Sequence, residues 1–522
     1  MMFHTDIFIL GFLPVCLAGF FSAGHFFSHS WALRWLAACS LFFYAWWNPE
    51  HVPLLVGSLV VNYLLAWKVR RTRSPLAWLS GGIGLNLAML GWFKYADFLL
   101  HIVLPDVPVL HIALPLGISF FTFQQIMYLV DTERSCRVAR VRVSSGLDRG
   151  IASDSAGWGG SRIKTGEDVN ESACLPIEGS PFLRYAAFVT FFPHLIAGPI
   201  VRPSEIIPQL AAPDLCHPRI ENLAGGLLVF LLGLGKKLVL ADLFGGFADT
   251  GFDAAAHGAA LTFFEAWYAT LAYALQIYFD FSGYSDMAIG LARMLNVRFP
   301  LNFDSPYQAT DIAAFWRRWH ITLSSFLRDY LYIPLGGSRA GPFRQGVNLM
   351  LTMLLAGLWH GAAWNFVIWG GLHGLFLVVH RLHGRFFRPL PELFGHALTL
   401  LAVIVAWVPF RATSLSGALG MLRGMGGING IVLPRMIVSA LPPLAVIAQP
   451  VSVMPSLGDA RTLSFPEVTA CLLLGWLIVL ALPNVHRMTL RARYWTLTGS
   501  FALSVQALFF APQIAPFLYF QF

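Results

Sequence analysis

The sequence has few charged residues for its length. Of 522 residues only 12% are Asp, Glu, Lys or Arg, whereas soluble globular domains carry about 25%. Hydrophobic residues make up 57% of the chain, and Phe alone occurs 44 times. That much apolar surface is too large for one water-soluble core, so lipid must act as part of the solvent. The composition therefore argues against a soluble fold.

Cysteine and metal-binding patterns are also scarce. The six cysteines show no CxxC pair and no spacing typical of a metal site. They are Cys16, Cys39, Cys136, Cys174, Cys216 and Cys471. The histidines that follow His360, at positions 373, 380 and 383, form no HExxH or other zinc pattern. We expect no metal site and no bound cofactor.

The basic residues do not form the stripe expected of a nucleic-acid-binding surface. The formal charge is +8, but Lys and Arg occur in short bursts between apolar runs. The bursts are Lys68–Arg73, Lys236–Lys237 and Arg317–Arg318. Such bursts are typical of cytoplasmic loops under the positive-inside rule. We interpret the excess charge as a topology signal.

Apolar runs long enough to cross the bilayer recur along the whole chain. They begin near Ile7, Trp31, Leu54, Leu76, Leu110, Phe182, Leu223, Leu261, Asn348, Ala363, His396, Met436, Val468 and Leu497. The first run lacks a basic n-region and a cleavage site, so we expect a retained span and not a signal peptide. The fold class predicted is an all-α polytopic membrane protein with about ten to thirteen spans, some of them re-entrant.

One polar segment interrupts this pattern. Residues 132–180 begin with several arginines and continue into a Ser/Gly-rich stretch. We expect a flexible, disordered cytoplasmic loop, either a tolerated insertion or a headgroup-binding or regulatory element. The predicted organisation is N-terminal transmembrane helices over 1–131, this loop over 132–180, a catalytic core over 181–410 and C-terminal transmembrane helices over 411–522.

Ionisable groups within apolar runs are candidates for function, because a charge at mid-span costs about 2.5 to 3.5 kcal/mol. A first cluster, Tyr273–Ala292, contains Asp280 and Asp286. Six residues correspond to about 240° around a helix, so the two carboxylates lie on different faces. The spacing does not indicate an acid/base dyad, and we expect these groups to pair with arginines or to cap broken helices.

A second cluster, Asp311–Gly337, places Trp316, Arg317, Arg318, Trp319 and His320 together. The arginines could pair with aspartates or bind an anionic donor. An ordinary interfacial amphipathic segment is the alternative.

The third cluster, Asn348–Phe376, contains His360 beside Trp359 and Gly361 after a long apolar run. A buried histidine is usually a satisfied core residue. An imidazole beside glycine, where substrate could approach closely, would instead suit proton abstraction from a hydroxyl near neutral pH.

Four segments closely resemble the alginate O-acetyltransferase branch of the membrane-bound O-acyltransferase family. They are LPLGISFFTFQQIMYLVD (114–131), FVTFFPHLIAGPIVRPSEIIPQL (188–210), the Asp280 cluster with LNFDSPYQATDIAAFWRRWHITLSSFLRDYLYIPLGG (301–337), and GLWHGAAWNFVIWG (357–370). The resemblance covers most of residues 1–410. The polar segment 132–180 departs from the family pattern, in which this stretch is shorter.

The resemblance implies a multi-helix bundle with re-entrant segments around a funnel and tunnel. His360, in the WHG motif, would be the principal catalytic residue, and His320, in the RRWH motif, its companion. Trp359, Arg317, Arg318, Asp280 and Asn365 are expected to contact substrate. An acetyl group from a cytoplasmic thioester such as acetyl-CoA would cross the bacterial inner membrane and O-acetylate an extracytoplasmic polysaccharide, alginate or a similar one.

The implied partners are a periplasmic or membrane-anchored acetyltransferase with a serine nucleophile and a polysaccharide synthase or export complex. Related proteins transfer D-alanyl groups or acetylate peptidoglycan and cellulose, which leaves the acceptor open. A transporter would also explain charges within the membrane. Transporters commonly carry internal repeats, and WHG and RRWH each occur once, which favours an enzyme. A non-catalytic scaffold would not need the histidines.

Overall fold

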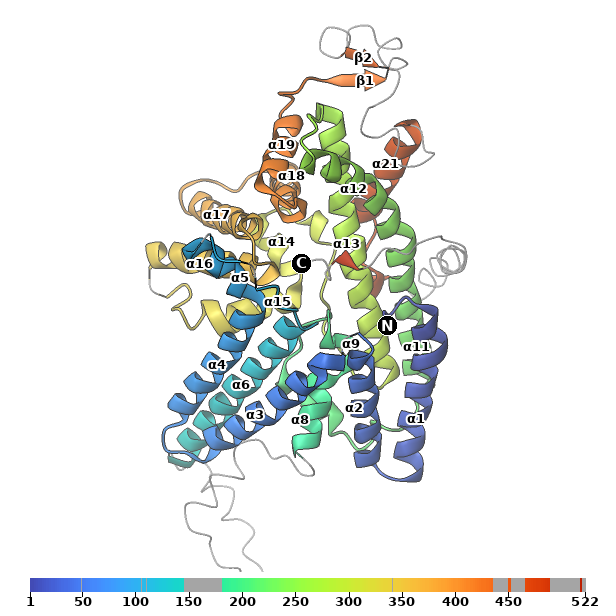
Figure 1. The fold of residues 1–522 in the computed structure, drawn as a ribbon, viewed down its shortest axis with the longest axis vertical. Coiled ribbons are helices and arrows are strands. Elements are labelled where there is room, and N and C mark those ends of the chain that lie inside the picture. Colours follow the sequence, from blue (N-terminus) through green and yellow to red (C-terminus); the bar gives the residue numbers. More distant parts are fainter. Residues whose placement is uncertain are drawn as a thin grey trace, which may run out of the picture. The chain divides into compact units, whose positions relative to one another are not determined.

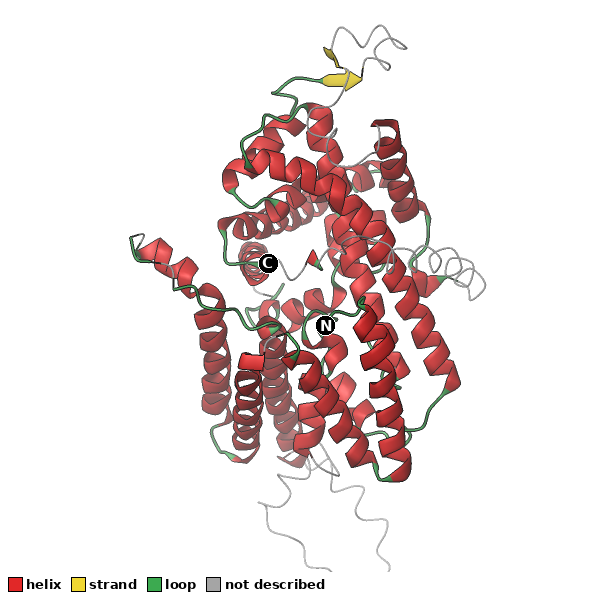
Figure 2. Cartoon of the chain, turned by 45° about the vertical axis from the view of Figure 1, so that its right-hand side comes forward, coloured by secondary structure: helices red, strands yellow, loops and turns green. Residues whose placement is uncertain are grey.

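The computed structural model describes residues 1–47, 49–104, 106–108, 110–144, 181–339, 341–434, 449–451, 465–488 and 517–518. Helices form almost all of the regular structure in these ranges (Figure 2). One short parallel pair of strands, β1 (Val432–Pro434) and β2 (Gln449–Val451), is the exception, with Val432 opposite Gln449. The predicted all-α class is confirmed.

The described chain divides into two compact units. The first comprises residues 1–2, 6–224 and 292–299, and the second residues 3–5, 225–291 and 300–522. Both units therefore draw on separated parts of the sequence. The sequential organisation into loop, core and C-terminal helices stays a prediction.

In the first unit, three helices pack side by side (Figure 1). They are α3 (Val52–Arg71), α4 (Pro75–Leu90) and α6 (Ile118–Ser144). Buried amides join them: Asn62 exchanges hydrogen bonds with Asn86, and donates one to Gln125 at 2.9 Å. Polar groups in an apolar setting need such partners. The unit also contains α1 (Leu13–Phe26), α2 (His29–Ala45), α5 (Ala96–Val103), α8 (Pro181–Thr190), α9 (Phe192–Leu195) and α10 (Pro203–Leu210).

Helix α6 corrects part of the predicted polar loop. The helix continues to Ser144, so residues 132–144 are helical and not a flexible loop. The Thr132 hydroxyl donates to the backbone carbonyl of Tyr128, and Arg137 binds Glu133 through two hydrogen bonds of 2.9 Å. Contacts between residues four positions apart stabilise a helix. We did not recognise this helix from the sequence because the Arg-rich composition resembles that of a loop. Residues 145–180 lie outside the described part of the chain.

The second unit contains the Asp280 cluster, the segments at 301–337 and 357–370 that resemble the family, and most of the remaining helices. They are α12 (Asp242–Ala256), α13 (Phe263–Met294), α14 (Ile312–Arg318), α15 (Ile321–Leu327), α16 (Pro342–His360), α17 (Trp364–Phe386), α18 (Glu392–Arg411), α19 (Leu415–Met425) and α21 (Phe465–Ala481). Helix α11 (Ile220–Gly235) begins in the first unit and ends in the second. Helices α16 and α17 lie against each other, as do α17 and α18.

Two lysines that we assigned to a cytoplasmic loop instead form ion pairs within the protein, with Lys237 buried and Lys236 partly buried. Lys236 and Lys237 lie in a π-helical turn, η5 (Lys236–Ala241). Lys237 Nζ is 2.9 Å from an Asp280 oxygen, and Lys236 Nζ is 2.7 Å from Asp286, which His486 also contacts. The aspartates thus pair with lysines and not with the arginines we expected. Asp280 and Asp286 lie more than forty positions from the lysines and leave no local pattern, so the charge burst alone suggested a solvated loop.

Five helical stretches in the described residues are long and apolar enough to cross a membrane. They are Ile7–Phe26, Pro49–Arg71, Pro75–Val103, Trp364–Phe386 and Glu392–Arg411. The chain is therefore a multi-pass membrane protein. The predicted runs near Met436 and Leu497 lie outside the described residues, and the total number of spans stays a prediction.

Removal of the Lys237 charge should destabilise the second unit strongly. In Lys237→Met, Asp280 and Asp242 lose their ammonium partner. Breaking one side of a buried ion pair costs about 3 to 5 kcal/mol, so the melting temperature in detergent should fall clearly. Arg328→Met is the control, because Arg328 is 60% exposed beside Asp329 and such a pair contributes about 0 to 1 kcal/mol. Equal losses in the two variants would contradict the buried pair's role.

Candidate active site

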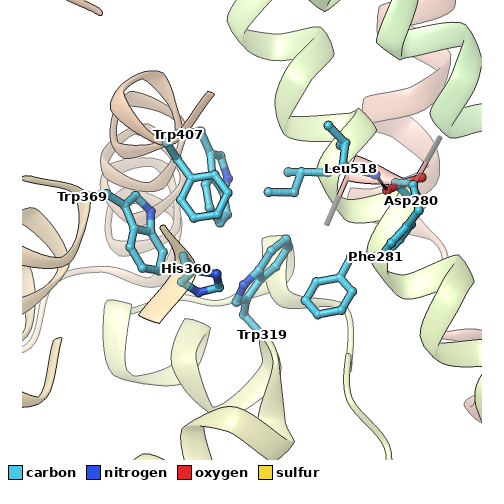
Figure 3. Close-up of a pocket in the computed structure, with 10 residues that line it drawn as sticks. Asp280, Phe281, Trp319, His360, Trp369, Trp407 and Leu518 are labelled. Atoms are coloured by element: carbon cyan, nitrogen blue, oxygen red, sulfur yellow. Dashed lines mark hydrogen bonds between the residues drawn. The ribbon is translucent and has the colours of Figure 1, made fainter. Parts of the chain in front are cut away.

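A small cavity in the second unit contains His360 in its wall (Figure 3). Its free volume is about 20 Å³, close to the room that one water molecule needs. The lining residues are Ile277, Asp280, Phe281, Trp319, His360, Trp369, Trp407, Phe410, Phe517 and Leu518. The walls are thus mostly aromatic, with one imidazole and one carboxylate.

The close approach of α16 and α17 positions His360. A Cβ atom on Gly357 would lie 2.2 Å from the backbone oxygen of Phe366, and one on Gly370 would lie 2.3 Å from that of Met353. Neither distance is compatible with a side chain, so only glycine at both positions lets the helices approach this closely. Helix α16 ends at His360, which places the imidazole at the helix crossing.

Aromatic rings hold the His360 imidazole from several sides. Its ring lies edge-on to Trp369 at 5.1 Å and to Phe410 at 5.2 Å, and Trp359 is 4.9 Å away, measured between centroids. His360 is only 7% exposed. Packing of this kind restricts the rotamers of a side chain and fixes the direction in which its ring nitrogens point.

His320 lies between α14 and α15 with a left-handed backbone, at φ of 42°. A non-glycine residue in this region is uncommon and is often found at functional sites. Both Trp319 and His320 are buried. Their burial argues against the alternative that this part of the second cluster, Trp319 and His320, is an exposed interfacial segment.

A hydrogen-bond network determines the tautomer of His320. The side-chain oxygen of Asn302 accepts from the backbone N–H of Thr322 at 3.3 Å and lies 3.0 Å from His320 Nδ1. A backbone N–H can only donate, so this Asn302 atom is an oxygen, and His320 Nδ1 must carry the proton toward it. The Asn302 amide nitrogen donates to the Ser285 hydroxyl at 3.0 Å.

The other ring nitrogen of His320, Nε2, therefore carries a lone pair in the neutral imidazole. Within the described residues it has no hydrogen-bond partner, and it is buried. Burial also lowers the pKa of His320, which favours the neutral form. Phe281 lies edge-on to the ring at 4.7 Å and Trp359 lies at 6.3 Å. An acceptor nitrogen is thus held beside the aromatic wall, oriented through Asn302.

The remaining predicted site residues occupy different environments. Asp280 lines the cavity, and Trp359 packs on His360 without belonging to the lining. Asn365 is buried at the start of α17 and donates to the backbone oxygen of Ala412. The Arg317 side chain is 69% exposed, and its guanidinium lies 4.0 Å from the Asp311 carboxylate. The backbone oxygen of Arg318 accepts a hydrogen bond from the backbone N–H of Asp304. The substrate contacts of these residues stay predictions.

Several residues of the site were not predicted from the sequence. Trp369, Trp407 and Phe410 lie in apolar runs, where nothing distinguishes a cavity wall from ordinary core. Asn302 could have been singled out, because it is a polar amide in the mostly apolar stretch RFPLNF, but the sequence does not show which residues it binds. Leu518 belongs to a C-terminal apolar run that gave no indication of a site.

The fold and the site together define a polytopic membrane protein with a histidine-bearing aromatic cavity in its helices. Residues 30–419 match the family model of the membrane-bound O-acyltransferase (MBOAT) family. The chain belongs to this family and is an O-acyltransferase.

The names of relatives within the family refer to different acceptors. The chain is 44% identical to a peptidoglycan O-acetyltransferase of Helicobacter pylori, over 83% of this chain and 81% of the relative. It is 37% identical to the "Probable alginate O-acetylase AlgI" of Pseudomonas aeruginosa, over 81% and 75%. A teichoic acid D-alanyltransferase of Streptococcus thermophilus is 29% identical, over 38% and 49%. The predicted family is confirmed.

Replacement of Asn302 should reduce acyl transfer through His320. Asn302→Leu removes the acceptor that holds Nδ1–H, and because a positioned acid or base contributes about 10² to 10⁴ in rate, we expect a loss of at least about tenfold. Asn302→Asp keeps an acceptor oxygen and should retain more activity than Asn302→Leu. The measurement is acyl transfer per amount of protein in membranes.

Asn348→Leu is the matched control for this experiment. Asn348 is a buried asparagine of α16 whose amide donates to the backbone oxygens of Leu335 and Gly337. Its loss should lower stability more than it lowers the rate per folded molecule. The positioning role is wrong if Asn302→Leu and Asn302→Asp lower the rate equally, or if neither does.

Proposed function

We propose that this protein transfers an acetyl group from a cytoplasmic thioester, acetyl-CoA, toward a glycan outside the cytoplasm. It does so as a multi-pass protein of the bacterial inner membrane. The observation that carries the proposal is the buried imidazole of His360 in an aromatic cavity, in a chain 37 to 44% identical to relatives named for acetyl transfer to alginate and peptidoglycan.

In the proposed mechanism His360 acts as general base. It takes the proton of an acceptor hydroxyl as the hydroxyl oxygen attacks the thioester carbonyl carbon, which forms the new C–O bond. The C–S bond then breaks, and the leaving thiolate receives the proton from the imidazolium. The products are an ester and a free thiol, so atoms and charges balance.

His320 has a supporting part in this mechanism. Its Nε2 is the ring nitrogen that does not face Asn302, and in the neutral form it is free to accept a hydrogen bond from a bound substrate. This nitrogen orients a donor or acceptor group through that hydrogen bond, and on protonation it would stabilise negative charge on the carbonyl oxygen. The left-handed backbone and the Asn302 network fix this geometry before substrate binds.

The aromatic walls protect the thioester. Trp319, Trp369, Trp407 and Phe410 surround the cavity beside His360, and its small free volume leaves little room for water. Exclusion of water strengthens electrostatic interactions and suppresses hydrolysis of a reactive acyl donor. The exclusion of water by the aromatic walls therefore favours transfer of the acyl group to an acceptor hydroxyl over hydrolysis of the thioester.

Completion of glycan acetylation is proposed to need a partner. A polysaccharide is bound along an extended groove with polar and aromatic groups, and in this proposal a second protein supplies that groove. The partner we propose is a periplasmic or membrane-anchored acetyltransferase with a serine nucleophile, which works with a polysaccharide synthase or export complex.

Peptidoglycan is the second candidate acceptor. The relative named for it is 44% identical, against 37% for the relative named for alginate. Deletion of the protein followed by ester analysis of isolated peptidoglycan and exopolysaccharide separates the two. Loss of acetyl esters from one glycan alone identifies the acceptor, and loss from neither would refute the proposed function.

Replacement of His360 with Ala should abolish glycan acetylation without reducing the protein in the membrane. A general base contributes about 10² to 10⁴ in rate, so the acetyl ester content should fall to background. His320→Ala should be severely impaired but retain measurable activity if His320 only orients the donor. The control is His380→Ala, since His380 lies in α17 and is 44% exposed. Normal acetylation in His360→Ala would exclude the mechanism.

The purified protein alone should acetylate polymer poorly. With acetyl-CoA and polysaccharide but no second protein, we expect little ester on the polymer, because in this proposal the partner supplies the polymer-binding groove. Addition of membranes from cells that contain the partner but lack this chain should restore transfer. Efficient transfer in the two-substrate mixture would show that the acceptor site is complete within this chain.

A further inference from the structure

The C-terminal end of the chain supplies part of the cavity wall. Phe517 and Leu518 are 1% and 5% exposed, and both line the cavity that contains His360. They lie almost a hundred residues beyond the family match, which ends at residue 419. In Figure 3 Leu518 lies across the open space from His360. A segment outside the family match therefore borders the reacting position.

Specific contacts fix this segment in place. The backbone N–H of Leu518 donates to an Asp280 oxygen at 2.9 Å, and the other Asp280 oxygen binds Lys237 at 2.9 Å. The Phe517 ring stacks on Tyr284 at 4.4 Å between centroids. A charge-assisted hydrogen bond to a buried carboxylate is stronger than an ordinary one. The position of Leu518 is thus coupled to the buried Asp280–Lys237 pair.

Leu518, like Ile277, is an aliphatic residue of the lining and differs in kind from the tryptophans of the wall. Trp319, Trp369 and Trp407 are large, rigid side chains that pack on one another, whereas Leu518 is an aliphatic side chain that fills space across from His360. Removal of its isobutyl group would enlarge the cavity without disturbing the aromatic packing. With so little free volume, one wall residue can decide how long an acyl chain fits.

We propose that Leu518, held in place by Asp280, sets the upper size of the acyl group that the enzyme transfers. This inference rests on the proposed acetyl transfer. An apolar pocket discriminates one methylene by about 10- to 200-fold, so a leucine in the wall is sufficient to favour acetyl over butyryl. The specificity determinant then lies outside the family match, which ends at residue 419.

Competition between two donors tests the assignment. Membranes that contain the full chain and its native glycan acceptors receive equal concentrations of acetyl-CoA and butyryl-CoA, and mass spectrometry gives the ratio of butyryl to acetyl esters. In Leu518→Ala this ratio should rise at least about tenfold over the natural protein. Leu518→Val should give an intermediate rise and keeps the test valid if the alanine variant is poorly folded.

Leu472→Ala is the matched control. Leu472 is a buried leucine of α21, 4% exposed, that does not line the cavity, and its loss should leave the ester ratio unchanged. An unchanged ratio in both Leu518 variants, or an equal rise in Leu472→Ala, would overturn the inference while acetyl transfer by the natural protein stands. If the natural protein transfers neither acyl group, the proposed function fails and the inference falls with it.

Discussion

The need to pair charges and polar groups that are removed from water is the constraint on which the second unit depends. A charged group in an apolar setting is tolerated when a partner compensates it. Lys237 and Asp280 satisfy this requirement between η5 and α13, and Lys236 with Asp286 repeats it about 1.7 turns further along α13. Because Asp280 also binds the Leu518 backbone, one ion pair joins two helical segments and the C-terminal end at the cavity wall.

The two imidazoles are held in different ways. His360 is held by rings and by the glycine-mediated crossing of α16 and α17. His320 is held by hydrogen bonds, with its tautomer imposed by Asn302. His360 is thus oriented by side-chain packing, and His320 by hydrogen bonds. Preorganisation of both before substrate binds is what a transfer reaction in a dry cavity requires, since little solvent can reorganise around the developing charge.

The sequence predicted those features that depend on composition and on contiguous motifs. Low charge and repeated apolar runs predicted a polytopic helical fold, and the WHG and RRWH motifs predicted the family. Features formed by distant partners were not predictable. The lysine pair at 236–237 looked like a loop because Asp280 and Asp286 lie far along the chain. Residues 132–144 were predicted wrongly for a different reason: the contacts that support their helix, such as Glu133–Arg137, are local, but the Arg-rich composition was interpreted as a loop. Asn302 and Leu518 acquire their significance only when the fold brings them beside His320 and His360.

The central proposal is that the protein, with His360 as general base, transfers an acyl group from a donor on one side of the membrane to an acceptor on the other. Vesicles with the purified protein in one orientation, radiolabelled acetyl-CoA confined to the cytoplasmic side and the acceptor partner outside test it directly. The account predicts labelled ester on the outer acceptor with the natural protein and none above background with His360→Gln. Equal labelling by the two proteins, or label that never leaves the donor side with the natural protein, would contradict it.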